Sequence, residues 1–84
     1  MSAESDRYIT LVDRSMVVFA SLRGYVNDGG RTPTLIFEKF GMSPTHFWQK
    51  VWRLVEDPAM AELQPAEVNR LRSLREAHRE RRTL

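Results

Sequence analysis

The 84-residue chain has no cysteine, and this absence excludes both disulfides and cysteine-ligated zinc as a means of holding a small domain together. Long apolar runs are also missing, because the longest strictly apolar stretch is MVVFA at 16–20. A membrane-spanning helix needs roughly 18 such residues. The polar start MSAESDRY does not look like a signal peptide. We therefore expect a soluble, cytoplasmic protein without a membrane segment, and a reducing compartment suits a chain without cysteine.

Residue types that carry catalysis are scarce as well. His46 and His78 are the only histidines, they lie far apart, and neither has metal-ligand spacing around it. The sequence has no Gly-rich phosphate loop and no nucleophile motif, since Gly29-Gly30 indicates only a loop. We expect a protein that is not an enzyme and that uses no cofactor and no metal.

The composition is that of one small folded domain, residues 1–84. Hydrophobic residues make up 42% of the chain, which argues against disorder. A chain this short buries a little over about 60% of its unfolded surface, so its core is small and pairing with a partner or a second copy is plausible. Charge is uneven: residues 1–38 hold four arginines against five acids, whereas 39–84 hold nine Lys and Arg against six acids. Six arginines fall within the last fifteen residues: Arg70, Arg72, Arg75, Arg79, Arg81 and Arg82.

Hydrophobic spacing predicts a first helix from about Asp6 to Arg23. Apolar residues recur there every three or four positions, and a second stripe contains Leu11, Val18 and Leu22. A helix that is apolar nearly all round is either central to its domain or shared with another subunit. This helix is therefore the candidate surface for a homodimer. The following stretch GYVNDGGRT reads as a loop.

All four prolines follow a polar residue, and each pair predicts a helix start. A Ser, Thr or Asp side chain caps the first turn, and proline at the next position lacks an N–H that would have been unpaired anyway. Thr32-Pro33 is expected to begin a helix through about Phe40, and Ser43-Pro44 one through about Glu56. Asp57-Pro58 predicts one short turn, and Gln64-Pro65 predicts a basic C-terminal helix and tail over 65–84. The predicted fold is all-α with four main helices.

Residues 33–56 have the pattern of a helix-turn-helix. Only Gly41, Met42 and Ser43 separate the second and third helices: glycine suits the left-handed end of a helix, methionine can turn into the core, and serine caps the next helix. Apolar residues follow Met42 after five and nine positions, at Phe47 and Val51. This spacing resembles sigma-factor-type DNA-binding units, in which the second helix lies in the major groove.

A helical wheel of 44–56 separates the DNA-binding candidates from the core. The inner arc contains Phe47, Val51, Leu54 and Val55, and the outer arc contains Thr45, His46, Gln49 and Arg53. Lys50 lies on one flank, and Trp48 and Trp52 lie on the other. Arg53 can pair with a guanine edge and Gln49 with an adenine edge. Lys50 and the last-helix arginines, among them Arg70, Arg72, Arg75 and Arg79, would attract the phosphate backbone. We therefore expect binding to double-stranded DNA.

Each of these signals also has a plainer explanation that stays open. Arg53 and Gln49 are ordinary solvent-facing helix formers, and tryptophans one turn apart often pack against a neighbouring helix. Arginines of the last helix can pair with Glu76 and Glu80 along the same helix. The alternative function is a protein-interaction module, such as a phage- or host-encoded regulator, that binds a larger protein through Trp48, Trp52 and the apolar first helix.

Residues 35–82 resemble a family of short, uncharacterised proteins from actinobacteria and some of their phages. The resemblance is carried by FEKFGMSPTHFWQ, by LVEDPAMAELQPAEVNRLRSLR and by the arginine-rich end. The resemblance implies a helical protein without an established activity, for which DNA binding is an expectation. It supports Gly41, Met42 and Ser43 as the turn and the last-helix arginines as a basic helix, and it implies no catalytic or binding residue.

Overall fold

The computed structural model describes residues 9–24 and 30–83, with side chains described as far as Arg79. The described residues form five α-helices and no strand, so the predicted all-α class is confirmed. The helices are α2 (Leu11–Arg23), α3 (Arg31–Phe40), α4 (Pro44–Val55), α5 (Pro58–Leu63) and α6 (Pro65–Thr83). The short turn expected after Asp57 is a helix in its own right, which raises the number of helices above the four main ones predicted.

Helix α2 begins later than its apolar pattern predicted. Thr10 is the N-cap: its hydroxyl accepts a hydrogen bond from the Asp13 amide at 3.0 Å, and the Asp13 carboxylate accepts one from the Thr10 amide at 3.2 Å. This reciprocal capping box satisfies two amides that would otherwise lack a partner, and it sets the start at Leu11. The predicted start at Asp6 lies outside the described residues.

The prediction that Thr32 caps the second helix was wrong. Helix α3 begins at Arg31 after Gly30, whose backbone is left-handed (φ 89°), and no side chain of the described residues caps it. The Gly30 carbonyl instead accepts hydrogen bonds from both the amide and the hydroxyl of Thr34. Thr32 lies inside the first turn and is buried, so its side chain is part of the packed face rather than a cap. The predicted end at Phe40 is confirmed.

The other three proline signals are confirmed. Ser43 accepts a hydrogen bond from the His46 amide at 3.2 Å, and Asp57 accepts one from the Ala59 amide at 2.9 Å. Proline is the first residue of α4, α5 and α6. Backbone hydrogen bonding in α6 starts with the Val68 amide donating to the Gln64 carbonyl. At three points along the chain, a new helix therefore begins where a polar side chain and a proline stand together.

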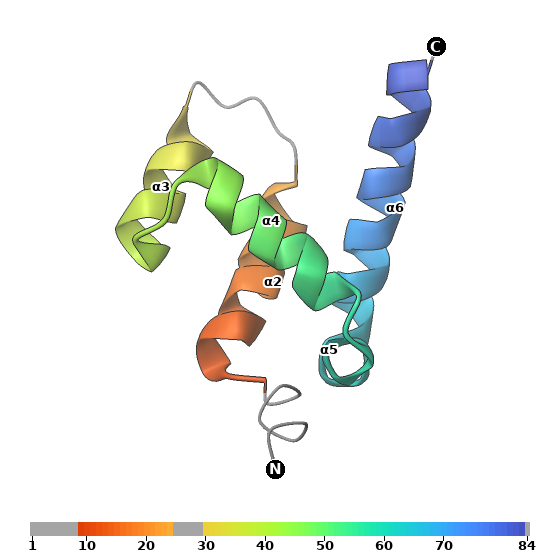
Figure 1. Cartoon of the computed structure of the whole chain (residues 1–84), viewed down its shortest axis with the longest axis horizontal. Helices are drawn as coiled ribbons and strands as arrows, with labels where there is room; N and C mark the ends of the chain where they lie inside the picture. Colours follow the sequence, from red (N-terminus) through yellow and green to blue (C-terminus); the bar gives the residue numbers. More distant parts are fainter. Residues whose placement is uncertain (1–8, 25–29, 84) are drawn as a thin grey trace.

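Helix α2 is central to the packing, as its apolar composition predicted. It packs against both α4 and α6, and α5 links the end of α4 to the start of α6. Figure 1 shows α4 crossing α2, with α3 beside one end of α4 and α6 beside the other. The core joins all five helices and consists of Met16, Val17, Ala20, Ile36, Phe47, Val51, Val55, Met60, Val68 and Leu71. None of the helices within the described residues is both long enough and apolar enough to cross a membrane.

Aromatic rings occupy the contact between α2, α3 and α4. The Phe47 ring lies edge-on to Phe19 at 5.8 Å and beside Phe40 at 5.3 Å, measured between ring centroids. Edge-to-face pairs of this kind add roughly 0.5–1.5 kcal/mol beyond the burial of their area. Phe47 is also the largest side chain that is fully buried. Phe47 therefore packs α4 against both α2 and α3.

Candidate functional site

The turn that presents α4 has the predicted residues in the predicted roles. Gly41 is left-handed (φ 66°, ψ 28°), and its amide donates to the Phe37 carbonyl at 2.8 Å, which ends α3. Met42 is partly buried against the core, and Ser43 caps α4. The chain therefore ends one helix and starts the next within three residues, and α3 and α4 are not one continuous rod.

Helix α4 has two faces of opposite character. Phe47, Val51 and Val55 are completely buried, and Leu54 is partly buried against the same core. The opposite face carries the side chains predicted to read DNA, all of them exposed: Thr45, His46, Gln49 and Arg53. Within the described residues these four side chains have no hydrogen bond or ion pair, and α4 itself contains no Asp or Glu. The outer face of α4 is consequently polar and accessible, and none of the described residues bonds to its side chains.

Lys50 lies on one flank of that face and is held by the fold. Its ammonium nitrogen is 3.8 Å from the Asp13 carboxylate, in the first turn of α2. Asp13 is well buried, with 14% of its side chain exposed, whereas 40% of the Lys50 side chain is exposed. Lys50 therefore faces solvent only in part, and its charge is partly neutralised.

The other flank carries Trp48 and Trp52, which were predicted as candidate partner-binding residues. Both rings are partly buried against the core, and their centroids lie 5.5 Å apart with the planes tilted by 30°. The Arg75 guanidinium of α6 lies over the Trp52 ring at 5.3 Å. The two tryptophans are therefore covered in part by their own domain, the plainer of the two explanations that the sequence left open.

Two predicted phosphate-binding arginines attach α6 to the end of α4. Arg75 donates to the Glu56 carboxylate at 3.0 Å, and Arg72 donates to the Val55 carbonyl at 3.3 Å. A cation near the last carbonyls of a helix satisfies acceptors that have no partner within the helix. The sequence analysis did not predict these contacts, because the paired residues are separated by 17 and 19 positions and no local pattern links them.

The arginines of α6 do not all share one side of the helix. At roughly 100° per residue, Arg72, Arg75 and Arg79 fall within an arc of about 60°. Arg70 lies roughly 140–200° away from them on the same wheel. Arg79 is exposed, one turn beyond the residues that contact α4. Arg72 and Arg75 thus contact the end of α4, Arg79 follows them on the same side of α6 by helical geometry, and Arg70 lies on a different side.

The chain belongs to a family described as "Protein of unknown function (DUF3263)", whose model matches residues 10–83. This match confirms the resemblance to a domain of unknown function over almost all of the described chain. No curated protein and no solved structure matches the chain.

Proposed function

We propose that this member of the DUF3263 family is a DNA-binding protein, a small transcriptional regulator that inserts α4 into the major groove of double-stranded DNA. In this proposal residues 33–56 act as a helix-turn-helix. The observation that carries it is the outer face of α4, where Thr45, Gln49 and Arg53 are exposed and unpaired within the described residues. Exposed side chains at regular helical spacing that make no hydrogen bond or ion pair with the described residues can bind another molecule.

The length of this face suits a short stretch of duplex. Thr45, Gln49 and Arg53 recur every four residues, so they span about 12 Å along the helix. At about 3.4 Å per base step, that length covers three or four base pairs. Arginine pairs with the guanine edge and glutamine with the adenine edge, and a threonine methyl can contact thymine. The expected target is a half-site of three or four base pairs that includes at least one A·T and one G·C pair.

The start of α4 offers one backbone donor for a phosphate. Pro44 has no N–H, the His46 amide donates to the Ser43 hydroxyl, and the Phe47 amide donates to the Ser43 carbonyl. The Thr45 amide is left for a phosphate oxygen, at the positive end of the helix dipole. His46 follows Thr45 and is exposed, and in this proposal it contacts the same phosphate.

The flanking cations set how strongly binding depends on salt. Lys50 lies on one flank of the outer face of α4, and Arg72 and Arg79 belong to α6. Ion pairs with Asp13 and Glu56 already use part of the charge of Lys50 and Arg75. With about three phosphates contacted, the slope of log K against log salt is about −2.7, and affinity falls about 40-fold between 50 and 200 mM salt.

The experiment is a selection from random duplexes, followed by gel-shift titration of the enriched site and of an unrelated duplex across salt concentrations. Arg53→Ala and Gln49→Ala should lose preference for the enriched site, because they remove base contacts. Arg79→Ala should weaken binding to both duplexes equally, and Arg70→Ala is the matched control with little effect. Binding that does not change with salt, or equal losses of preference in all four variants, would overturn the proposal.

The homodimer predicted from the apolar first helix stays a prediction. Two copies would place their α4 helices about 34 Å apart, one turn of DNA. A half-site of three or four base pairs carries little specificity, so pairing on DNA would help recognition. Sedimentation of the protein with and without the enriched duplex tests this prediction: two copies per duplex would support a homodimer, and one copy would count against it.

A further inference from the structure

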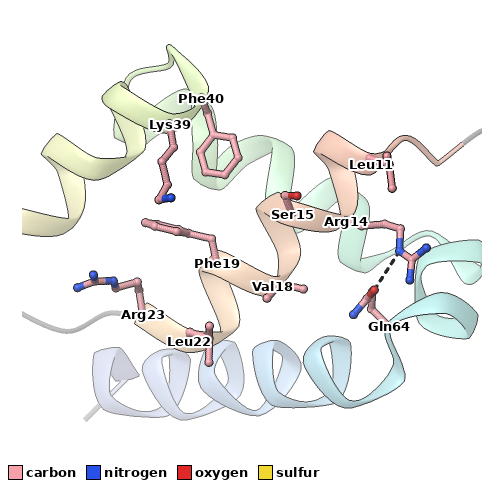
Figure 2. A pocket seen from close by; sticks show the side chains of 10 residues that line it. All are labelled: Leu11, Arg14, Ser15, Val18, Phe19, Leu22, Arg23, Lys39, Phe40 and Gln64. Carbon is pink, nitrogen blue, oxygen red and sulfur yellow. Dashed lines mark hydrogen bonds between the residues drawn. The ribbon is translucent and has the colours of Figure 1, made fainter.

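An open apolar groove lies on the side of α2 that faces away from the core. Its volume is about 580 Å³, and α2, α3 and Gln64 line it. Figure 2 shows Leu11 near one end of α2, Val18 and Leu22 toward the other, and Phe40 reaching in from α3 towards Phe19. Leu11 and Leu22 are 78% and 73% exposed, although both are leucines on a central helix. The second apolar stripe of the first helix is therefore left uncovered by the described residues.

The charged residues that line this groove are all positive. Arg14, Arg23 and Lys39 line it, and no Asp or Glu is among the lining residues that the structure describes. The Arg14 Nε donates to Gln64 at 3.0 Å, which holds that guanidinium at one end of the groove, as the dashed line in Figure 2 marks. Arg23 lies over the Phe19 ring at 5.8 Å, near the other end of α2. Lys39 is exposed and has no ion pair with any described residue.

We propose that this groove docks an amphipathic helix of a partner protein, with leucine-type residues on one face and acidic residues on its flanks. Leu11, Val18 and Leu22 lie on one side of α2 and span about 16 Å, or three helical turns. A partner helix of similar length would cover them, as amphipathic helices do in apolar grooves. The cations are about 13 Å apart along α2, from Arg14 to Arg23, so carboxylates near both ends of the partner helix would meet them.

The charge of the groove argues against a second copy of this chain as the occupant. Two copies packed α2 against α2 would bring Arg14, Arg23 and Lys39 of each close to the same cations of the other. Like charges placed across an interface oppose association and suppress the wrong partner. An acidic helix has the opposite charge at the same positions.

This proposal does not depend on DNA binding. Met16, Val17 and Ala20 of α2 are buried, and Figure 2 shows α4 behind α2 as seen from the groove. The groove and the outer face of α4 are consequently separate surfaces. A regulator built this way could hold DNA on one side and an acidic partner helix on the other.

The test uses a synthetic, fluorescently labelled helical peptide of about 18 residues, with leucine at the spacing that fills one helix face and glutamate on both flanks. The matched control peptide has lysine in place of every glutamate. Fluorescence anisotropy with the full chain should show the glutamate peptide binding about tenfold or more tightly than the lysine peptide, and added salt should reduce the difference. Lys39→Glu should reduce the ratio of the affinities for the glutamate and lysine peptides, because it removes one of the cations that line the groove.

Matched variants then locate the binding surface. Leu22→Ser should weaken binding of the glutamate peptide about tenfold, whereas Phe37→Ser, which changes a 64% exposed residue of α3 outside the groove, should leave it unchanged. Circular dichroism checks that both variants stay folded. Equal binding of the two peptides, or equal loss in the two variants, would overturn the proposal. So would self-association that Leu22→Ser abolishes, because a second copy would then be the occupant.

Discussion

Replacing Gly41 by alanine is the sharpest test of the turn between α3 and α4. Gly41 is left-handed (φ 66°), and its amide closes the last turn of α3 by donating to Phe37. A Cβ built at this position meets no atom within 4 Å. Any change in stability on adding that Cβ therefore reports backbone conformation and not a steric clash.

The size of the effect follows from two opposing terms. An L-residue in the left-handed region costs about 1–2 kcal/mol. Alanine also restricts the unfolded chain, which offsets about 0.4–1 kcal/mol of that cost. We expect Gly41→Ala to lower the free energy of unfolding by about 1 kcal/mol, and the melting temperature by about 4–8 °C for a domain of this size.

Urea and thermal unfolding, followed by circular dichroism, measure the change. Gly41→Asn should cost less, because asparagine tolerates the left-handed region. Gly24→Ala should cost more than Gly41→Ala, because its Cβ would also lie 3.3 Å from the Leu74 Cδ1. If α3 and α4 were one continuous helix, Gly41→Ala would instead stabilise the protein by up to about 1 kcal/mol. A gain in stability would therefore refute the turn, and with it the presentation of α4.

Three further substitutions test other parts of the structure. Phe47→Ala removes the largest fully buried side chain of the described residues and should lower the free energy of unfolding by about 3–5 kcal/mol. Thermal unfolding should then show little or no cooperative transition. A loss of less than about 1 kcal/mol would contradict the packing of Phe47. Ser43→Ala removes the cap of α4 and should cost about 1 kcal/mol in urea, and no change would mean that the cap is not formed. A double-mutant cycle on Arg75 and Glu56 should give a coupling energy below about 1 kcal/mol, because the Glu56 side chain is 65% exposed. A larger coupling energy would mean that the pair is more buried from solvent than the structure shows.

Local signals predicted most of the helices. Ser43-Pro44 and Asp57-Pro58 mark helix starts because the cap bonds an amide only two or three residues away, and neither needs the rest of the fold. Thr10 and Asp13 form a capping box that the sequence also displays, so the start of α2 was open to prediction and was missed. Thr32-Pro33 misled the prediction, because a buried threonine within the first turn has the same local sequence as a capping one.

The candidate DNA-reading face was predicted for the same reason. Helical periodicity alone places Gln49 and Arg53 opposite Phe47 and Val51, whatever the helix packs against. Helical periodicity does not predict which acidic side chains the basic residues pair with. Lys50 meets Asp13 from another helix, and Arg75 meets Glu56 across 19 positions of the chain. Such pairs depend on where whole helices lie, and a basic stretch of sequence does not reveal them.

The sequence by itself determined where α4, α5 and α6 begin, where α2 and α3 end, and which side of α4 is apolar, because caps and amphipathic spacing act over one or two turns. Only the tertiary structure decided which apolar and basic groups remain outside the core. Burial of Met16 and Val17 against the other helices leaves Leu11 and Leu22 of the same helix uncovered. Packing of α6 on α4 places Arg72 and Arg75 against the end of α4, where Arg72 donates to the Val55 carbonyl and Arg75 pairs with Glu56. These outcomes follow from the placement of helices relative to one another, which contacts between residues far apart in the chain decide.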